Sequence, residues 1–202
     1  MSVIGRFAFA TLCGLVLAAI AHVGVILLLP FLSERAAFTR LQPTHETGEP
    51  ILVAGPQTRG WLSQHDPSTA LTACAYDLSE APLRVTFTTG SHFQSAAFHG
   101  RGAGAFFAIT DRAIDASVID VLLMTPEQRF EEEALSTAIT EVDDTGEIPI
   151  DPLEGVLRVT APEAQGFVAF RVLAPLTGLA QAASERALSA RCTPFPLDAI
   201  AD

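Results

Sequence analysis

The sequence lacks lysine entirely, and its basic side chains are 12 arginines set against 23 acidic residues. The formal net charge is -11, which makes the whole chain a poor binder of nucleic acid or of anionic lipid surfaces, because both are bound through basic charge. Charged residues are only 17% of the chain and hydrophobic residues 49%, which excludes a largely disordered protein. The length of 202 residues suits one domain of ordinary size plus a short extra segment.

Recognisable catalytic and metal-binding motifs are also missing. There is no G-x-S-x-G motif of the kind that presents a nucleophilic serine. His92 and His99 are seven residues apart, so on a regular strand they face opposite sides and do not share a metal ion. The run Glu131–Glu133 predicts a solvated helix face, because consecutive helical residues diverge by about 100°. We therefore predict no catalytic residues, no cofactor and no metal site.

One glycine-rich segment resembles a nucleotide-binding motif. Gly100–Ala105 matches G-x-G-x-x-A, a tolerated form of the dinucleotide fingerprint. That fingerprint needs a helix directly after it, so that backbone N–H groups meet the pyrophosphate. Ala105–Thr110 has the composition of a strand instead, and we interpret the glycines as a turn.

A 26-residue run without charge, Phe7–Leu32, follows a short tail of residues 1–6. As a helix it would extend about 39 Å, enough to cross a hydrocarbon core of about 30 Å. Ala19-Ile20-Ala21 resembles a signal-peptide cleavage site, which is the alternative. Because the apolar run continues well past that site, we predict an uncleaved transmembrane helix.

Two observations bear on the orientation of this helix, and they disagree. Arg6 on one side against Arg35 and Arg40 on the other weakly favours a cytoplasmic C-terminus. A short N-terminal tail before a large C-terminal domain is instead typical of a signal anchor with an exported domain. We predict a single-pass inner-membrane (cytoplasmic-membrane) protein with its soluble domain in the periplasm.

The cysteines favour the same compartment. Cys13 lies in the apolar run, which leaves Cys74 and Cys192 to pair in an oxidising environment. Two unrelated buried thiols are the alternative, and the disulfide is our prediction. Within the apolar run, His22 is either a functional or helix-pairing residue or a tolerated neutral histidine.

The rest of the chain is expected to contain a linker at residues 33–50, a β-rich domain at 51–196 and a tail at 197–202. Within the linker, residues 33–41 can prolong the helix by a turn or two before residues 42–50 break it. Apolar and polar residues alternate through Leu83, Val85 and Phe87, as in a half-buried strand. Strands are predicted at 71–77, 82–88, 93–99, 105–110, 117–124, 155–160 and 166–173.

Two helices are predicted beside these strands. The first covers 126–134, with Thr125 as N-cap and Gln128 at the capping-box position. The second covers 177–190, with Thr177 as N-cap. Short strands separated by turns predict a mainly β (α+β) fold, a single antiparallel sandwich or barrel with two flanking helices.

Five segments carry a resemblance to a known family: Cys74–Val85, Phe106–Arg112, Arg158–Pro162, Gly166–Leu173 and Arg191–Cys192. Together they resemble the domain of unknown function numbered 1254, through diffuse motifs that extend over most of the chain. His22 and the Leu27–Pro30 segment resemble the N-terminal membrane helix of its short alphaproteobacterial members. The resemblance implies a jelly-roll-like β-sandwich and a separate companion protein with the domain numbered 1214. It implies no activity and no catalytic residues.

The expected function is a non-enzymatic envelope protein whose anchored domain binds a partner. The alternative is a ligand-binding or hydrolase subunit whose site is completed by the companion. Tyr76 with Asp77, and Asp111 with Arg112, form the possible polar site. Their plainer interpretation is an aspartate that caps a turn and an Arg–Asp pair that holds two strands together.

Overall fold

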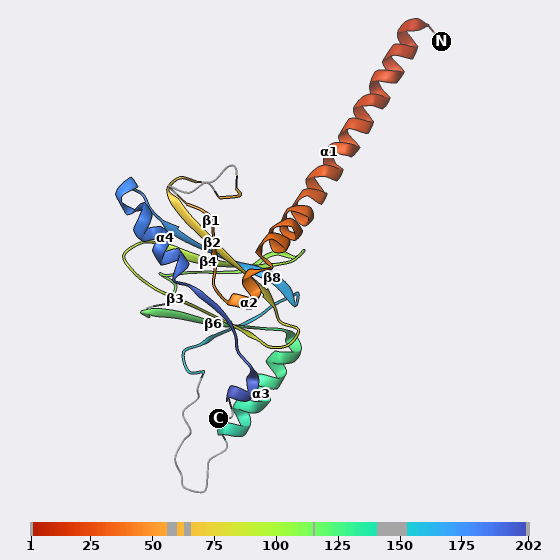
Figure 1. Cartoon of the computed structure of the whole chain (residues 1–202). Coiled ribbons are helices and arrows are strands. Elements are labelled where there is room, and N and C mark those ends of the chain that lie inside the picture. Colours follow the sequence, from red (N-terminus) through yellow and green to blue (C-terminus); the bar gives the residue numbers. More distant parts are fainter. Residues whose placement is uncertain (1, 56–59, 63–65, 115, 141–152, 201–202) are drawn as a thin grey trace, which may run out of the picture.

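The computed structural model describes residues 2–55, 60–62, 66–114, 116–140 and 153–200. A long helix, α1 (Val3–Leu41), projects away from a β-rich domain (Figure 1). Of the described helices, α1 is long and apolar enough to cross a membrane, and its apolar part is not buried in the protein. By length and composition, α1 is consistent with a single-pass anchor or with a signal sequence.

The range 33–50, predicted to be a linker, is mostly helical and partly buried. The helix α1 continues past Leu32 to Leu41, and a short helix, α2 (Thr44–Thr47), follows it. Phe38 and Leu41 are buried against the domain. The hydroxyl of Thr44 accepts a hydrogen bond from the N–H of Ala75 at 2.7 Å, which ties this segment to a strand. The segment therefore belongs to the domain and fixes where α1 leaves it.

The strands form two sheets. The first has the order β1-β2-β8-β4-β5 and is antiparallel throughout. Its strands are β1 (Ile51–Ala54), β2 (Thr69–Asp77), β8 (Gln165–Leu173), β4 (Gln94–Gly100) and β5 (Gly104–Thr110). The second has the order β7-β6-β3-β9, with β7 parallel to β6. Its strands are β7 (Leu157–Thr160), β6 (Val118–Met124), β3 (Leu83–Thr88) and β9 (Arg191–Pro194).

One hydrophobic core joins the two sheets. Tyr76 and Phe98 of the five-stranded sheet contribute to it, together with Val85 and Val121 of the four-stranded sheet. The predicted α+β class is confirmed, while the parallel β6–β7 pair departs from a purely antiparallel arrangement. The strands predicted from the sequence did not include β1 and β9, which are strands of four residues.

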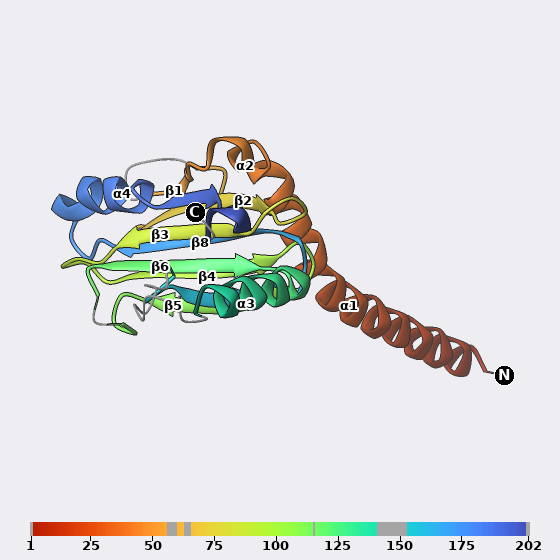
Figure 2. The same ribbon diagram turned by 90° about the horizontal axis from the view of Figure 1, so that it is seen from below.

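The helices lie around the two sheets (Figure 2). The first predicted helix is α3 (Pro126–Thr140), which begins where predicted and extends further. Its capping box is present: the N–H of Gln128 donates to Oγ1 of Thr125, and the N–H of Thr125 donates to Oε1 of Gln128. The structure therefore contains the local signal that the sequence predicted at this helix start.

The second predicted helix is divided into two parts. A 3₁₀ turn, η1 (Thr177–Leu179), precedes α4 (Ala180–Leu188). The N-cap of α4 is Leu179, which makes no capping side-chain bond, so the predicted start at residue 177 is wrong for the α-helix. The predicted tail includes a second 3₁₀ turn, η2 (Leu197–Ile200), and its last two residues lie outside the described part.

A disulfide joins Cys74 of β2 to Cys192 of β9, the pairing favoured from the sequence. Their Cα atoms are 6.7 Å apart, and both residues belong to the core shared by the two sheets. The bond therefore links the five-stranded sheet to the four-stranded one across the core.

Candidate functional site

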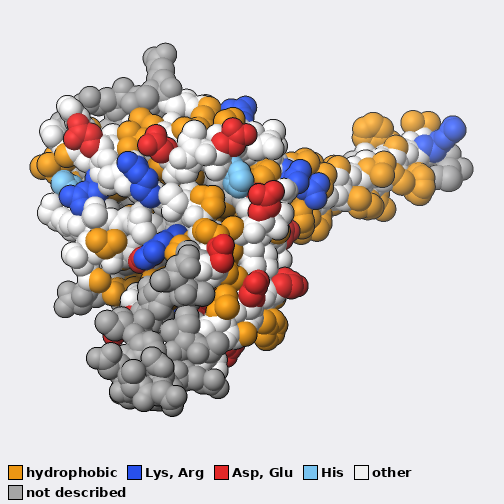
Figure 3. Space-filling model, turned by 60° about the horizontal axis from the view of Figure 1, so that its bottom comes forward, with side chains coloured by type: hydrophobic (Ala, Val, Ile, Leu, Met, Phe, Trp, Pro, Cys, Tyr) orange, Lys and Arg blue, Asp and Glu red, His pale blue; other side chains and the backbone are white. Residues whose placement is uncertain are grey.

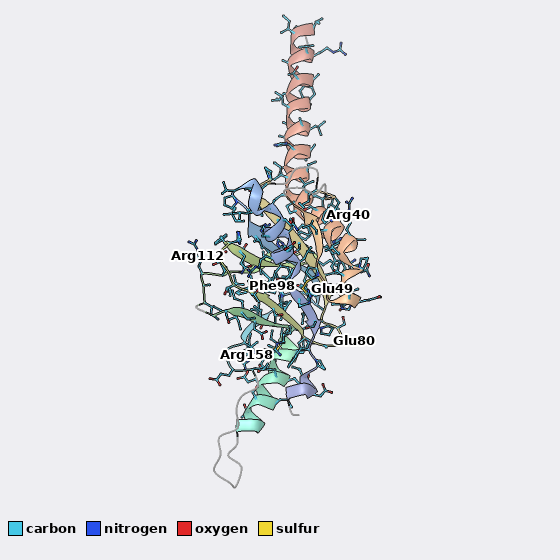
Figure 4. All side chains as sticks on the ribbon, turned by 60° about the vertical axis from the view of Figure 1, so that its left-hand side comes forward. Arg40, Glu49, Glu80, Phe98, Arg112 and Arg158 are labelled. Atoms are coloured by element: carbon cyan, nitrogen blue, oxygen red, sulfur yellow. A yellow bond between two sulfur atoms is a disulfide. The ribbon has the colours of Figure 1, made fainter. Side chains whose placement is uncertain are left out.

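The four residues predicted as a possible polar site lie at opposite ends of the five-stranded sheet. Tyr76 pairs with Gly166 at one end of β2. Asp111 follows Thr110, which pairs with Ser95 at the other end of β4. Figure 4 shows the separation: Glu80, just after β2, and Arg112 are labelled on opposite sides of the domain. These residues do not form one site.

At one end, Tyr76 and Asp77 have local structural roles. The buried hydroxyl of Tyr76 donates to the carbonyl of His99 at 3.2 Å, and burial, followed by the charge of Glu163, raises its pKa. Asp77 accepts hydrogen bonds from the N–H of Ser79 and from Nε2 of Gln165. Burial acts to raise the pKa of Asp77, but these hydrogen bonds outweigh it and lower the pKa. Asp77 is thus a turn cap, as the plainer interpretation had it.

At the other end, Asp111 and Arg112 face different neighbours. Oδ1 of Asp111 is buried without a hydrogen-bond partner in the described part of the chain. The guanidinium of Arg112 lies 5.6 Å from the ring centroid of Phe93. The ion pair that joins two strands is instead Arg84 of β3 with Asp120 of β6, at 2.7 Å, and Asp120 raises the pKa of Arg84.

The structure also places His22 and the run Glu131–Glu133. His22 is exposed on the projecting part of α1. The predicted solvated face at Glu131–Glu133 is wrong for its middle residue, because Glu132 is only 2% exposed. Oε1 of Glu132 lies 2.8 Å from Nε of Arg158, which joins α3 to β7. The sequence analysis missed this pair because the partner lies in a distant strand.

A cleft of about 630 Å³ opens where the end of α1 passes over the outer face of the five-stranded sheet. The wall from α1 consists of Ser33, Glu34, Ala36, Ala37, Arg40 and Leu41. The sheet and the chain between β1 and β2 contribute Val53, Trp61, Leu62, Leu71, Ala73, His99, Phe167, Ala169 and Arg171. Its volume lies in the range of small-molecule sites, about 300–1,000 Å³.

The floor of the cleft consists of alternate residues from the central strands. Along β2 and β8, Tyr76 and Phe170 point into the core, while Ala73 and Ala169 face outward beneath α1. Small alanine side chains leave space that larger residues would fill. The cleft is therefore a consequence of side-chain size on one face of the sheet.

His99 lies at the centre of the site. Its ring stacks on Phe167, with centroids 4.6 Å apart and planes 6° apart, and its Nδ1 lies 3.5 Å from Oε1 of Glu34. Burial lowers the pKa of His99; the carboxylate of Glu34 opposes this effect and the charge of Arg171 adds to it. Burial thus favours the neutral form of the imidazole. The positive charges of the cleft are those of Arg40 and Arg171.

The glycine-rich segment holds α1 in place. The turn between β4 and β5 brings the N–H of Gly104 to 2.7 Å from Oε2 of Glu34, and Gly104 has a φ of +77°, a conformation that favours glycine. The N–H of Gly102 donates to Oε2 of Glu163 at 2.8 Å, and a Cβ on Gly102 would lie 3.6 Å from the ring of Phe31. Because β5 follows directly, this segment is a turn, as predicted.

Arginine side chains gather at the same junction. Arg35 and Arg101 line a second, more polar hollow beside Phe31, and Figure 3 shows basic side chains where the projecting helix meets the domain. Arg40 is labelled at the base of the helix in Figure 4, and its guanidinium lies 5.2 Å from the ring centroid of Trp61. The acidic chain thus presents several arginine side chains at this junction.

This junction is a site that the sequence does not reveal. Glu34, Arg40, Trp61, His99 and Arg171 come from separate segments and form no motif. The one usable signal was size: alanine occupies two alternate positions of β2, Ala73 and Ala75. Small side chains at alternate positions indicate a strand face that leaves space, but they do not indicate which element or ligand covers that face.

Comparisons with known proteins identify no family. No family model matches the chain, and no curated protein matches it. Among solved structures, the VPA0106 protein from Vibrio parahaemolyticus is similar over 66% of this chain, with 12% identity and a TM-score of 0.47. An uncharacterised protein from Burkholderia cenocepacia is similar over 67%, with 9% identity and a TM-score of 0.39. The chain spans 29% and 32% of the lengths of these two proteins.

Proposed function

We propose that this protein is a single-pass, membrane-anchored binding protein whose β-rich domain lies in the periplasm, at the surface of the inner membrane. The observation that carries the proposal is the attachment of α1. The helix continues from the apolar run into the domain, where Phe38 and Leu41 are buried. The apolar run extends eleven residues past the possible cleavage site at Ala19-Ile20-Ala21 and passes without a break into this packed part of the helix. A continuous helix of this kind suits an anchor that positions the domain.

The disulfide supports the periplasmic location. Cys74 and Cys192 are bonded in the core, and such bonds persist in oxidising compartments. Export of the domain places both residues in that environment, and the short N-terminal tail stays in the cytoplasm.

The geometry favours binding over catalysis. The carboxylate of Glu34 is engaged by the N–H of Gly104, and the hydroxyl of Ser33 donates to the carbonyl of Pro30 at 2.9 Å. The resemblance of the sequence implies a companion membrane protein with the 1214-type domain as the partner. A jelly-roll-like sandwich, the form implied by that resemblance, suits a domain that presents surfaces for such a partner.

A second candidate is a hydrolase or ligand-binding subunit completed by the companion. The observation that favours it is the imidazole–carboxylate pair of His99 and Glu34 within a cleft. A partner that supplied a nucleophile to this pair would complete a catalytic site.

Three measurements test the proposal. A reporter fused after Asp202 that is active only when exported is expected to be active. N-terminal sequencing of the mature protein is expected to find residues before His22. Purification from detergent-solubilised membranes is expected to recover the companion without turnover on a broad substrate panel.

A cytoplasmic reporter signal or a mature start at His22 contradicts the anchored, exported domain. Turnover by the complex, lost in His99→Gln, favours the second candidate.

A further inference from the structure

We infer that the cleft between α1 and the five-stranded sheet binds a membrane phospholipid, with an acyl chain over the alanine floor and the phosphate at Arg40 and Arg171. The inference rests on the proposed membrane anchoring and adds the ligand class and the residues that recognise it. It concerns one lipid held by the protein, not attraction of the acidic chain to a charged surface.

The position of the cleft supplies the first argument. Its wall begins at Ser33, directly after the apolar run ends at Leu32. From Ser33 to Leu41 the helix rises about 12 Å. The interfacial region on each side of a bilayer is about 5–7 Å thick, so the cleft begins at the level of the lipid headgroups. A lipid of the adjacent leaflet can reach it without crossing bulk water.

The lining supplies the second argument. The floor is apolar: Val53, Ala73, Phe167 and Ala169 lie below the helix and form one cluster with Leu41 of α1. An acyl chain moving from the bilayer to this floor exchanges one apolar environment for another. It also covers the part of the apolar lining that remains open in the cleft, which favours binding.

Charge supplies the third argument. Arg40 and Arg171 line the cleft, and neither forms an ion pair with a carboxylate of the described residues. Glu34 faces the same space, but its carboxylate is held by Gly104 and lies beside His99. Guanidinium groups recognise phosphate through charge-assisted hydrogen bonds. The pair of arginines beside an apolar floor therefore matches a phosphate attached to an acyl chain.

The experiment uses the full chain in detergent and its single tryptophan. Trp61 lines the cleft, so a phosphatidylethanolamine with a brominated acyl chain should quench its fluorescence. Unbrominated phosphatidylethanolamine should compete, and diacylglycerol, which lacks the phosphate, should compete more weakly. If the brominated lipid does not quench Trp61 and no lipid competes, the inference is overturned. That result would not affect the reporter test of topology.

Matched variants separate the cleft from general contact with detergent and lipid. Arg40→Gln and Arg171→Gln should each weaken competition by phosphatidylethanolamine about tenfold and leave diacylglycerol unchanged. Arg112→Gln, at the far end of the sheet, is the charge control.

Ala36→Phe should abolish quenching, while Thr39→Phe, exposed on the same helix outside the cleft, should not. Equal effects of the cleft and control variants would overturn the inference. If Ala36→Phe leaves the quenching by brominated lipid unchanged but abolishes binding of the companion, the cleft is instead a binding site for the companion.

Discussion

The two faces of the five-stranded sheet are made by the same strands but hold different structures. On the inner face, Tyr76 and Phe98 pack against the second sheet with no solvent exposure. On the outer face, Ala73 and Ala169 lie beneath α1 and leave a cleft. The comparison shows that alternation along a strand sets which residues share a face, while side-chain size sets whether that face is filled or hollow.

The largest expected difference between the faces comes from removing an aromatic ring. Phe98→Ala should lower the free energy of unfolding by about 3–5 kcal/mol, because its site cannot collapse. Phe167→Ala should cost less, about 2 kcal/mol, because its ring borders the open cleft. Urea unfolding of the detergent-solubilised chain, followed by Trp61 fluorescence, measures both. Phe130→Ala is the control, since Phe130 is 74% exposed. Equal losses for Phe98 and Phe167 would remove the distinction between the faces.

Cutting the covalent link on the inner face should have the next largest effect. Replacing Cys74 and Cys192 by serine should cost about 2–4 kcal/mol, because the bond closes a long loop, with a sequence separation of 118. Unfolding with and without reductant provides the measurement, and the variant should lose the effect of reductant. Cys13→Ser changes a free cysteine on α1 and should leave stability unchanged. A wild-type protein indifferent to reductant would argue against the bond.

Enlarging a small residue should distinguish the faces in a third way. Ala96→Leu inserts methylene groups into the filled core and should destabilise the protein by about 1–3 kcal/mol. Ala73→Leu points into the cleft and should cost under about 0.5 kcal/mol, because space is available there. Thermal unfolding monitored by circular dichroism compares the two variants. A large loss for Ala73→Leu would show that the outer face is as closely packed as the inner one.

The smallest expected effect is a pH dependence on the outer face. Because burial lowers the pKa of His99 below 6.5, the unfolded state takes up a proton more readily than the folded state. The stability contribution is therefore complete above pH 6.5 and declines as the pH falls below that value. His99→Gln should flatten the dependence of the unfolding temperature between pH 7.5 and 5, and His92→Gln should leave it in place. An unchanged profile in His99→Gln would mean that His99 does not titrate differently on folding.

The extent of prediction from the sequence differs from element to element. The start of α3 was predictable because Thr125 and Gln128 form a capping box within four residues. The central strands were predictable because their alternation is local. The burial of Glu132 was not, since it depends on Arg158, which pairs from another element. The four residues of the predicted polar site, Tyr76, Asp77, Asp111 and Arg112, lie at opposite ends of the sheet because of its strand register. No local sequence pattern shows that register.

The sequence by itself determined the apolar run of Phe7–Leu32, the α+β class and the two faces of the strand Leu83–Thr88, because these follow from local periodicity. Only the tertiary structure decided that Phe38 and Leu41 pack against the domain, that Gly104 holds Glu34, and that Arg40 and Arg171 border one cleft. These contacts join residues far apart in the chain. Their formation depends on how whole elements pack, which a local pattern does not contain.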